Sequence, residues 1–592
     1  MGKAADFTQC LIKINGIAVS EEFMDALVEV VVDTSLHLPS MFTILLNDAD
    51  VKWVDDGLFE MGKEVEIEVE TGKEQGALKG QLIKGEITAL EPHFSTEGQT
   101  TLLVRGYHKF HRLHRGKQTR TFLKRKDDAV VQKIAGEVGL SPEIDPTSVT
   151  YDYILQNNQT NMEFLSARAA RIGYQVYAAE GKLYFKKGDA VLGEGPELSI
   201  GENLISFQPS LTASRQADKI VVKGWDQKGK KAIVAQATPN SRLNQGGMTK
   251  TGGDMAKSAF GAAEAVITDQ PVFLADEATA LATGVSNDMN RESVQAEGTC
   301  WGDPRVKAGW TVTIKGIGQR FSGKYFVTSA THVYNLSGYE TTFSISGRQP
   351  NTLSHLLDNG HGPTFELMNG VVTALVTNLN DPENLGRVKV KYAWLGEIES
   401  DWVRMAGAER GFYYIPEVND EVLIAFEQGN VHHPYIIGVL WNSQNKPPKP
   451  NSAVVQGGKV VERIIKSRSG HVVILNDTDG QEQIIIRDKT EKNEIVIDSA
   501  KNSMTIKVDG DFTVEAKGKI TLKSTQDMTL DTQANSSIKA MGNLNAEATG
   551  NGTVKGVQLT LEGSAKSTLK GALVGVEASG VAEVKGALVK IN

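Results

Sequence analysis

The C-terminal part of the chain repeats a short pattern of apolar and polar positions. From residue 504 onward, two apolar residues separated by one polar residue recur every eight positions, and glycine often occupies the turn. Alternation with a period of two is typical of a half-buried strand, and glycine accepts the positive φ of a tight corner. The apolar positions of the repeat are Met504, Ile506, Phe512, Val514, Ile520, Leu522, Met528, Leu530, Ile538, Leu544 and Val554.

An eight-residue unit with two apolar side chains cannot bury a core within one chain. The repeat therefore predicts that several chains wrap around one another, so that their apolar stripes meet on a common axis. With three chains, each octad advances by one strand spacing of about 4.8 Å, which gives an intertwined triple-stranded β-helix. A single-chain solenoid or a flat antiparallel sheet is the alternative.

The amino-acid composition of the chain changes just before this repeat. Phe512 is the only aromatic residue after Trp441, and no proline follows Pro450. Three prolines within residues 442–452 favour an extended spacer. The residues before this spacer therefore belong to differently packed domains, and a length of 592 residues suggests about four domains in all.

Residues 365–441 contain five apolar runs separated by turn signals, which predict a small closed β-barrel. In the second run, alternation divides the side chains between two faces. It predicts an interior with Val388, Val390, Tyr392 and Trp394 and an opposite face with Arg387, Lys389 and Lys391. Because the aromatic side chains then point inward, a nucleotide-binding or sugar-binding face on this barrel is not favoured.

The first 360 residues combine many strands with a few helices. Residues 63–72 alternate strictly, with valine and isoleucine on one face and the glutamates of Glu64–Glu70 on the other. Helices are expected over residues 127–139, from a capping box at Thr160 and Glu163 to near residue 173, and over residues 275–290. This part is therefore a mostly β scaffold with inserted helices.

Composition excludes several classes of protein. A net charge of -9 disfavours a protein that grips nucleic acid through its phosphates. The two cysteines, Cys10 and Cys300, exclude a disulfide framework and a cysteine-rich metal site. The N-terminus lacks the apolar run of a signal peptide, and no apolar stretch approaches the roughly 20 residues that cross a bilayer.

Three polar clusters in the sequence are candidate chemical sites. His108, His111 and His114 alternate with arginines that would repel a cation, so a basic segment against a neighbouring chain is favoured over a metal site. The carboxylates at 417–421 and the pair His432-His433 lie in predicted turns, which favours turn chemistry over catalysis. The Glu64–Glu70 ridge is expected to be a solvated strand face; the alternative is a negative lining of a trimer surface that blocks edge pairing. No cofactor, metal or catalytic residue is predicted.

Several segments resemble known parts of contractile tails. Residues 108–140 and 156–177 are similar to the late-control-D hub proteins of phage tails. DPENLGRVKV at 381–390 and PEVNDEV at 416–422 resemble the OB domain at the base of a spike. The order of hub, OB domain and octad repeat is that of VgrG-type spike proteins of contractile injection systems, including type VI secretion systems.

The resemblance implies a mainly β fold with six parts and a homotrimeric needle. These parts are a hub β-barrel (1–120), an α+β hub insertion (121–210), a second hub β-barrel (211–360), an OB-fold domain (361–445), spacer and neck strands (446–498) and the octad-repeat β-helix needle (499–592).

The resemblance further implies a central spike and hub at the tip of a phage-tail-like injection apparatus, without enzymatic activity. It would adapt a hexameric tube to a threefold needle that penetrates the target envelope mechanically. The expected partners are the inner tube protein, baseplate proteins, effector cargo and a PAAR-type tip protein that contacts Val589, Ile591 and Asn592. Assembly is expected in the bacterial cytoplasm, in a particle that is released or attached to the envelope.

Two other functions are consistent with parts of the sequence. A trimeric tail adhesin or polysaccharide-binding protein would also contain a β-helix, but it should carry surface aromatics and a carboxylate groove. An OB-type nucleic-acid binder is disfavoured by the acidic net charge.

Overall fold

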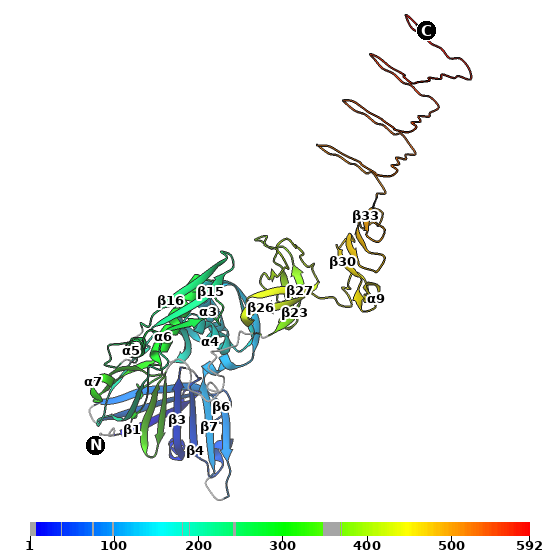
Figure 1. Ribbon diagram of the computed structural model, residues 1–592. Coiled ribbons are helices and arrows are strands. Elements are labelled where there is room, and N and C mark those ends of the chain that lie inside the picture. The colour runs from blue at the N-terminus through cyan, green and yellow to red at the C-terminus, as the bar shows by residue number, and fades with distance from the viewer. Residues whose placement is uncertain are drawn as a thin grey trace. The chain divides into compact units, whose positions relative to one another are not determined.

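A computed structural model describes residues 7–36, 38–73, 76–96, 100–179, 181–188, 190–240, 244, 246–346, 368 and 370–591. The chain is mainly β, as the sequence predicted, and forms two compact units, residues 1–461 and 462–592 (Figure 1). Among the described residues, no helix is long and apolar enough to cross a membrane.

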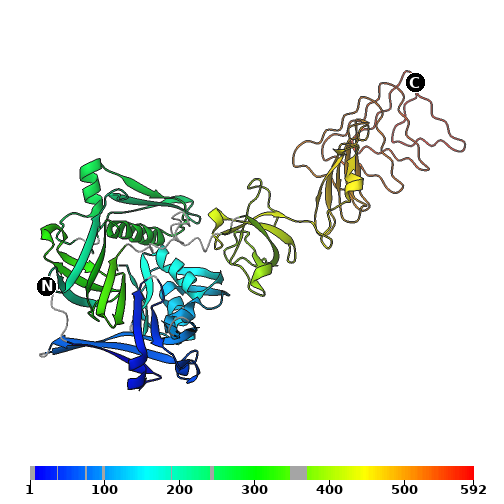
Figure 2. The ribbon, with the colours of Figure 1, turned by 90° about the horizontal axis from the view of Figure 1, so that it is seen from below.

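One sheet of eleven strands runs through the N-terminal part of the first unit (Figure 2). Its strands, in spatial order, are β14 (Leu204–Leu211), β18 (Val294–Trp301), β22 (Gly338–Ile345), β21 (Ser329–Asn335), β3 (Leu27–Ser35), β4 (Met41–Asn47), β7 (Thr101–His108), β6 (Gly76–His93), β5 (Glu64–Lys73), β1 (Phe7–Ile14) and β2 (Ile17–Ala18). The antiparallel pair β3 and β21 therefore joins strands from the first and the third predicted segment of the hub.

Smaller sheets and the helices pack around this sheet. The sheets are β10 (Thr150–Gln159) with β8 (Gln118–Lys126); β11 (Tyr174–Ala179), β12 (Lys182–Lys187) and β9 (Ser141–Ile144); β13 (Gly193–Ser199), β19 (Trp310–Lys315) and β20 (Gly323–Phe326); and β16 (Lys231–Ala237), β15 (Lys219–Asp226) and β17 (Glu264–Ile267). The helices are α1 (Glu21–Ala26), α2 (Lys52–Asp55), η1 (Lys109–His114), α3 (Asp127–Glu137), α4 (Asn161–Arg171), α5 (Gly252–Phe260), α6 (Ala275–Arg291) and α7 (Gly318–Phe321).

The three predicted helices are confirmed as α3, α4 and α6. Helix α4 begins with the predicted capping box, in which Thr160 Oγ1 accepts the Glu163 N–H at 3.1 Å and Glu163 accepts the Thr160 N–H at 2.8 Å. Helix α3 buries Val130 and Ile134. Beyond it, Gly139 has a φ of 71°, which glycine accepts without steric cost.

The predicted small barrel is present, with all five strands. They are β23 (Val371–Asn378), β24 (Lys389–Tyr392), β25 (Arg404–Met405), β26 (Glu421–Phe426) and β27 (Pro434–Val439), joined by the short helices η2 (Ala393–Leu395) and η3 (Glu427–Gly429). Reciprocal backbone hydrogen bonds of 3.1 and 2.7 Å between Val388 and Val403 close the barrel. Leu155 of β10 packs into the barrel's core, which ties the barrel to the α+β part of the same unit.

One prediction for the barrel is wrong. Val388, Val390 and Tyr392 are buried as expected, but Trp394 is 37% exposed. Strand β24 ends at Tyr392, and the tighter turn of η2 changes the side-chain phase, so Leu395 takes the buried position instead. The Trp394 ring lies outside and stacks on Tyr392 with ring centroids 4.7 Å apart.

The last part of the chain begins after the proline-rich spacer. A short helix α9 (Asn451–Val454) and the hairpin of β28 (Val455–Gln456) and β29 (Lys459–Val460) end the first unit. The second unit starts with a five-stranded antiparallel meander made of β30 (Glu462–Lys466), β31 (Val472–Asn476), β32 (Gln483–Arg487), β33 (Glu494–Asp498) and β34 (Ser503–Lys507). Residues 508–591, all of which are described, contain no strand or helix and are exposed throughout.

Candidate assembly interfaces

The predicted axial residues are all uncovered in a single chain. Met504 and Ile506 lie on β34, and the other nine lie in the extended segment that follows it. Every one of them is exposed, from 49% for Ile506 to 82% for Leu530. Exposing side chains of this size to water costs roughly 1.5–3 kcal/mol each relative to burial. The chain alone therefore leaves these eleven apolar side chains without a cover.

The meander extends this stripe toward the N-terminus. Each of its last four strands presents an apolar pair at positions i and i+2, and the cross-strand register places these pairs opposite one another on one face of the sheet. The pairs are Val473 and Leu475, Ile484 and Ile486, Ile495 and Ile497, and Met504 and Ile506. We call this surface the neck face. The two apolar positions that recur in each octad, beginning with Met504 and Ile506, therefore continue two rows of apolar side chains on the meander.

Sequence analysis missed the neck face because its period is irregular. Successive pairs there are separated by eleven, eleven and nine residues, whereas the needle repeats every eight. The longer spacing accommodates the turns of an antiparallel meander. The available signal was the alternation itself, since each strand carries two apolar residues with one residue between them.

The predicted contact for a tip protein lies at the C-terminal end of the second unit. Val589 is 46% exposed and Ile591 is 90% exposed, so both side chains are available to a partner. Asn592 lies outside the described residues.

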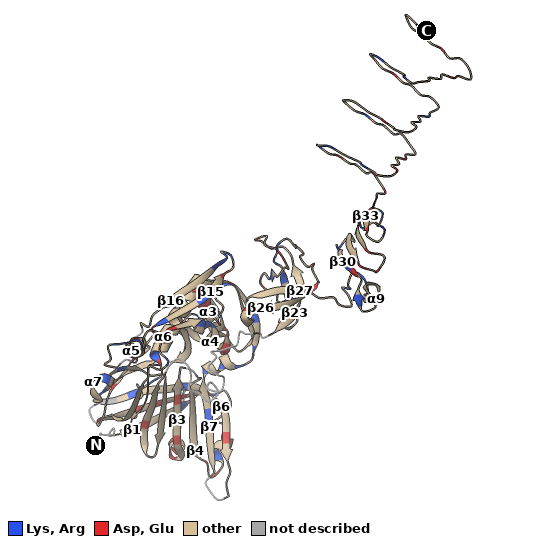
Figure 3. Cartoon of the chain, in the orientation of Figure 1, with Lys and Arg blue, Asp and Glu red and all other residues tan. Residues whose placement is uncertain are grey.

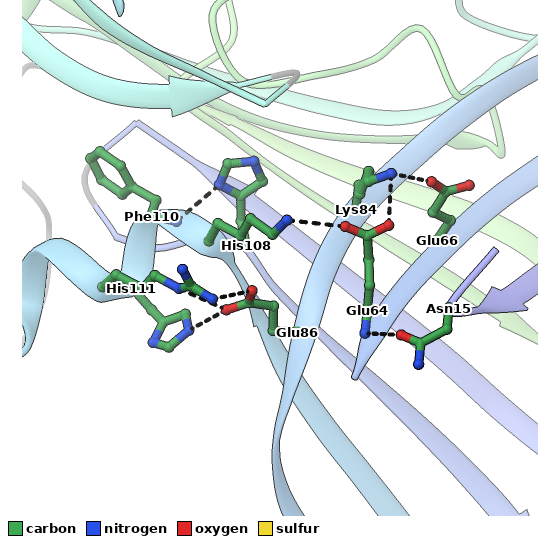
Figure 4. Close-up of polar contacts among 10 residues, drawn as sticks. Asn15, Glu64, Glu66, Lys84, Glu86, His108, Phe110 and His111 are labelled. Atoms are coloured by element: carbon green, nitrogen blue, oxygen red, sulfur yellow. Dashed lines mark hydrogen bonds and ion pairs between the residues drawn. The ribbon is translucent and has the colours of Figure 1, made fainter. Parts of the chain in front are cut away.

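Lysines pair with Glu64, Glu66 and Glu68 of the Glu64–Glu70 ridge. Lys84 Nζ lies 2.8 Å from Glu64 Oε1 and also bonds Glu66, and Lys109 Nζ lies 3.1 Å from Glu64 Oε2 (Figure 4). Hydrogen bonding to Lys84 lowers the pKa of Glu64 and, reciprocally, raises the pKa of Lys84. Strand β5 is hydrogen-bonded on both sides, to β1 and β6, so β5 is not itself a sheet edge. That the ridge lines a trimer surface stays an untested alternative.

The three histidines near residue 110 have separate roles. His108 is buried, and its Nδ1 accepts the N–H of Phe110 at 3.2 Å (Figure 4). His111 Nε2 lies 3.2 Å from Glu86 Oε2, and the same carboxylate binds Arg112 at 2.6 Å. His114 is exposed, although partial desolvation of its ring lowers its pKa. Within the described ranges, no group of three or more His, Cys, Asp or Glu side chains is arranged to hold a metal ion.

The remaining candidate sites, the carboxylates at 417–421 and the pair His432-His433, stabilise turns and the packing of the barrel against its neighbours. Asp420 accepts the Glu417 N–H at 2.8 Å, and Glu421 accepts a side-chain N–H of Asn442 at 2.8 Å. His432 Nε2 accepts the Leu155 N–H at 2.9 Å, and the ring of His433 stacks on a phenylalanine. These side chains form turns and join the barrel to β10.

Asp381 holds together the turn that leads into β24. It lies in DPENLGRVKV, and its carboxylate accepts the N–H groups of Glu383 at 3.0 Å and Leu385 at 2.8 Å. The Arg387 guanidinium binds the same carboxylate at 2.6 Å, and this hydrogen bond holds the pKa of Asp381 well below its usual range. One aspartate thus folds the turn that leads into β24.

The predicted basic face of this barrel is paired with acid. Besides Arg387, Lys391 lies 2.6 Å from Glu397 and Lys389 lies 3.5 Å from Glu399. The outward-facing cations that could attract a phosphate backbone therefore already have partners within the barrel.

Buried histidines predict a dependence of stability on acidity. Burial lowers the pKa of both His108 and His332 to about 4, whereas an unfolded histidine titrates near 6.5. Between these values the unfolded chain binds more protons, so the free energy of unfolding falls as pH falls, by up to about 1.4 kcal/mol per pH unit for each histidine. Calorimetric melting temperatures should drop steadily from pH 6.5 to 4.5. His108→Asn should flatten this slope, whereas His93→Asn, at an exposed site, should not.

Two family models match the chain. The Alg8 N-terminal domain matches residues 4–335, and the type VI secretion system/phage-baseplate injector OB domain matches residues 372–441. The second match covers the five-stranded barrel, which is therefore an OB domain of the injector type.

Known spike proteins and a solved structure are similar to this chain, in agreement with the match to the injector OB domain. The spike protein VgrG1a of the Pseudomonas aeruginosa type VI secretion system is 25% identical over 227 residues, which are 30% of this chain and 34% of that protein. VgrG1c of the same organism is 23% identical over 447 residues, 64% of this chain and 56% of that protein. The chain thus spans about a third and just over half of the length of these two relatives. The lidded PdpA–VgrG complex of Francisella has the same fold, with a TM-score of 0.53 and 10% identity over 86% of this chain and 81% of that chain.

The mainly β hub, the injector OB domain and these relatives define a VgrG-type spike protein, which confirms the resemblance found in the sequence. The chain belongs to the family of the Alg8 N-terminal domain.

Proposed function

We propose that three copies of this chain form the central spike of a contractile phage-tail-like injection apparatus. The hub would adapt a hexameric tube to threefold symmetry, and the needle would penetrate the target envelope and carry a tip protein or cargo. The role is mechanical, without enzymatic activity. The apparatus would assemble in the bacterial cytoplasm, in a particle that is released or attached to the envelope.

The observation that carries the proposal is the uncovered apolar stripe. It starts on the neck face, where four strands align eight apolar side chains, and continues through the octads to at least Val554. A sheet covered on one face needs a second apolar layer, and an identical chain supplies an identical stripe. Three such stripes facing one axis bury one another.

The solution mass tests this arrangement. Light scattering should give the full-length chain a mass three times 64.1 kDa. A shortened chain ending at Val461, the boundary of the first unit, should have a weakened or absent trimer because it lacks both the neck face and the octads. A monomeric full-length chain would contradict the shared axis.

A tip protein is the second expected partner, and its site is testable. Deleting residues 587–592 removes the exposed Val589 and Ile591 without touching the predicted axial residues. We expect the deletion to abolish co-purification of a PAAR-type protein while the trimer mass is kept. Unchanged co-purification would place the tip contact elsewhere.

A further inference from the structure

Two adjacent histidines hold the OB barrel against the hub. Among the described strands, β10 pairs with β8 alone, so its other edge is open to the barrel. At this edge the N–H of Leu155 donates to His432 Nε2 at 2.9 Å, and the Leu155 side chain is buried in the barrel's core. The ring of His433 stacks on Phe273, with centroids 3.2 Å apart. We call these four residues the joint.

The hydrogen bonds of His432 define its protonation state. Asn430 Oδ1 accepts the backbone N–H of His432 at 3.0 Å, so this atom is an acceptor. His432 Nδ1 lies 3.1 Å from the same oxygen and therefore carries a hydrogen. Because Nε2 accepts the Leu155 N–H, the ring is neutral. An imidazolium has no lone pair, so protonation of Nε2 removes this acceptor from the buried Leu155 N–H.

His433 is also held in its neutral form. Desolvation of its ring, with smaller contributions from His432 and Arg171, lowers the pKa of His433 to about 2. Arg171 of α4 is paired with Glu277 of α6 at 2.5 Å; basic residues are blue and acidic residues red in Figure 3. The carboxylate nearest to this side of the joint is therefore already bound to an arginine.

The other carboxylates at the joint do not favour a charged histidine either. The N–H of Glu427 donates to the His433 carbonyl at 3.0 Å, but the Glu427 carboxylate accepts the Tyr435 hydroxyl. Burial raises the pKa of Asp401, which acts on Tyr153 of β10. Protonation of Asp401 on acidification would thus favour the bound barrel, so this residue opposes the two histidines.

We propose that the joint is an acid-sensitive switch, in which protonation of His432 and His433 releases the OB barrel from the hub below about pH 6.5. The change takes place within one chain, so the inference does not depend on the proposed trimer. At neutral pH the barrel is fixed to β10. In an acidic compartment it separates from β10, stays attached through the chain, and moves independently of the hub.

The released state binds more protons than the bound state. A histidine in water titrates near 6.5, whereas both rings of the joint are neutral while the barrel is bound. The ratio of released to bound barrel should therefore rise by up to about tenfold per pH unit below 6.5 for each histidine. The remaining polar contacts, such as that of Gln428 with the Thr268 carbonyl at 3.1 Å, contain no group that titrates in this range.

Hydrogen exchange of the full-length protein, followed by mass spectrometry, tests the switch. The Leu155 amide is protected while it donates to His432, so its protection, corrected for the intrinsic effect of pH on exchange, measures release. We expect this protection to fall at least about tenfold between pH 7.5 and 5.5. The amide of Val131, buried on α3, should stay protected at both pH values, which separates release from unfolding of the chain.

Variants that cannot gain a proton provide the control. His432→Gln keeps an acceptor for the Leu155 N–H, and His433→Phe keeps a ring on Phe273. Together they should hold the protection of Leu155 constant from pH 7.5 to 5.5. His93→Asn, at an exposed site, should leave the loss as in the unaltered protein. Constant protection in the unaltered protein overturns the proposal, and so does a loss that persists in the double variant or that the reference amide of α3 shares.

Discussion

Replacing Ile520 by Asp is expected to abolish the trimer of the full-length chain. Ile520 is 53% exposed in one chain and lies at a predicted axial position, so in the trimer three carboxylates would meet on the axis. Removing an unpaired charge from water costs several kcal/mol, and three such charges also repel one another. Light scattering should show loss of trimer mass, and calorimetry should show loss of the transition that the needle contributes.

Thr521→Asp is the matched control for this prediction. Thr521 lies between Ile520 and Leu522, and with a period of two its side chain faces outward. The same charge one residue away should leave both the mass and the melt unchanged. Equal loss in both variants would mean that the octad has no inner and outer face.

Replacing Arg168 by Met is expected to destabilise the hub by about 3–5 kcal/mol. Arg168 Nε lies 2.7 Å from Asp127 Oδ1, with the two side chains 3% and 1% exposed. Burial raises the pKa of Asp127, and the Arg168 guanidinium opposes that shift. Without the guanidinium, the carboxylate is left uncompensated in the core shared by α3 and α4. The melting temperature of the hub should fall by several degrees.

The double variant Asp127→Asn with Arg168→Met distinguishes lost pairing from lost packing. Removing both charges deletes the desolvation cost, so most of the stability should return. If the double variant is as unstable as Arg168→Met, the arginine acts through its packing instead, including its contact over the Tyr151 ring at 4.2 Å. Neither residue belongs to the needle, so the trimer mass should not change.

Local patterns predicted local structure well. The capping box of α4, the positive φ at Gly139 and the five strands of the OB domain all follow from residues within a few positions of one another. Helix α5 could have been found in the same way, because Thr251 and Asp254 form a second capping box. Trp394 was misplaced because alternation holds only while the strand lasts.

Long-range pairing could not be predicted from these patterns. The hydroxyl of Thr34 in β3 donates to the carbonyl of Ala330 in β21, 296 positions away. Both strands alternate, and alternation says which face is buried but not which strand lies alongside. The same reason hid the contact of Leu155 with the OB core. The assignments of the axial residues and of the tip contact stay predictions, because they concern other chains.

The meander of the neck has a consequence for how three chains would find a common register. Its strands pair with their immediate neighbours in sequence, so it has the low contact order of a structure that folds fast. The octads, in contrast, contain no strand within a single chain over residues 508–591. The neck would therefore act as a template for the trimer. Three preformed meanders would dock first through their neck faces, and this contact would fix the register of the three chains relative to one another. The octads would then wind together from residue 508 toward the C-terminus.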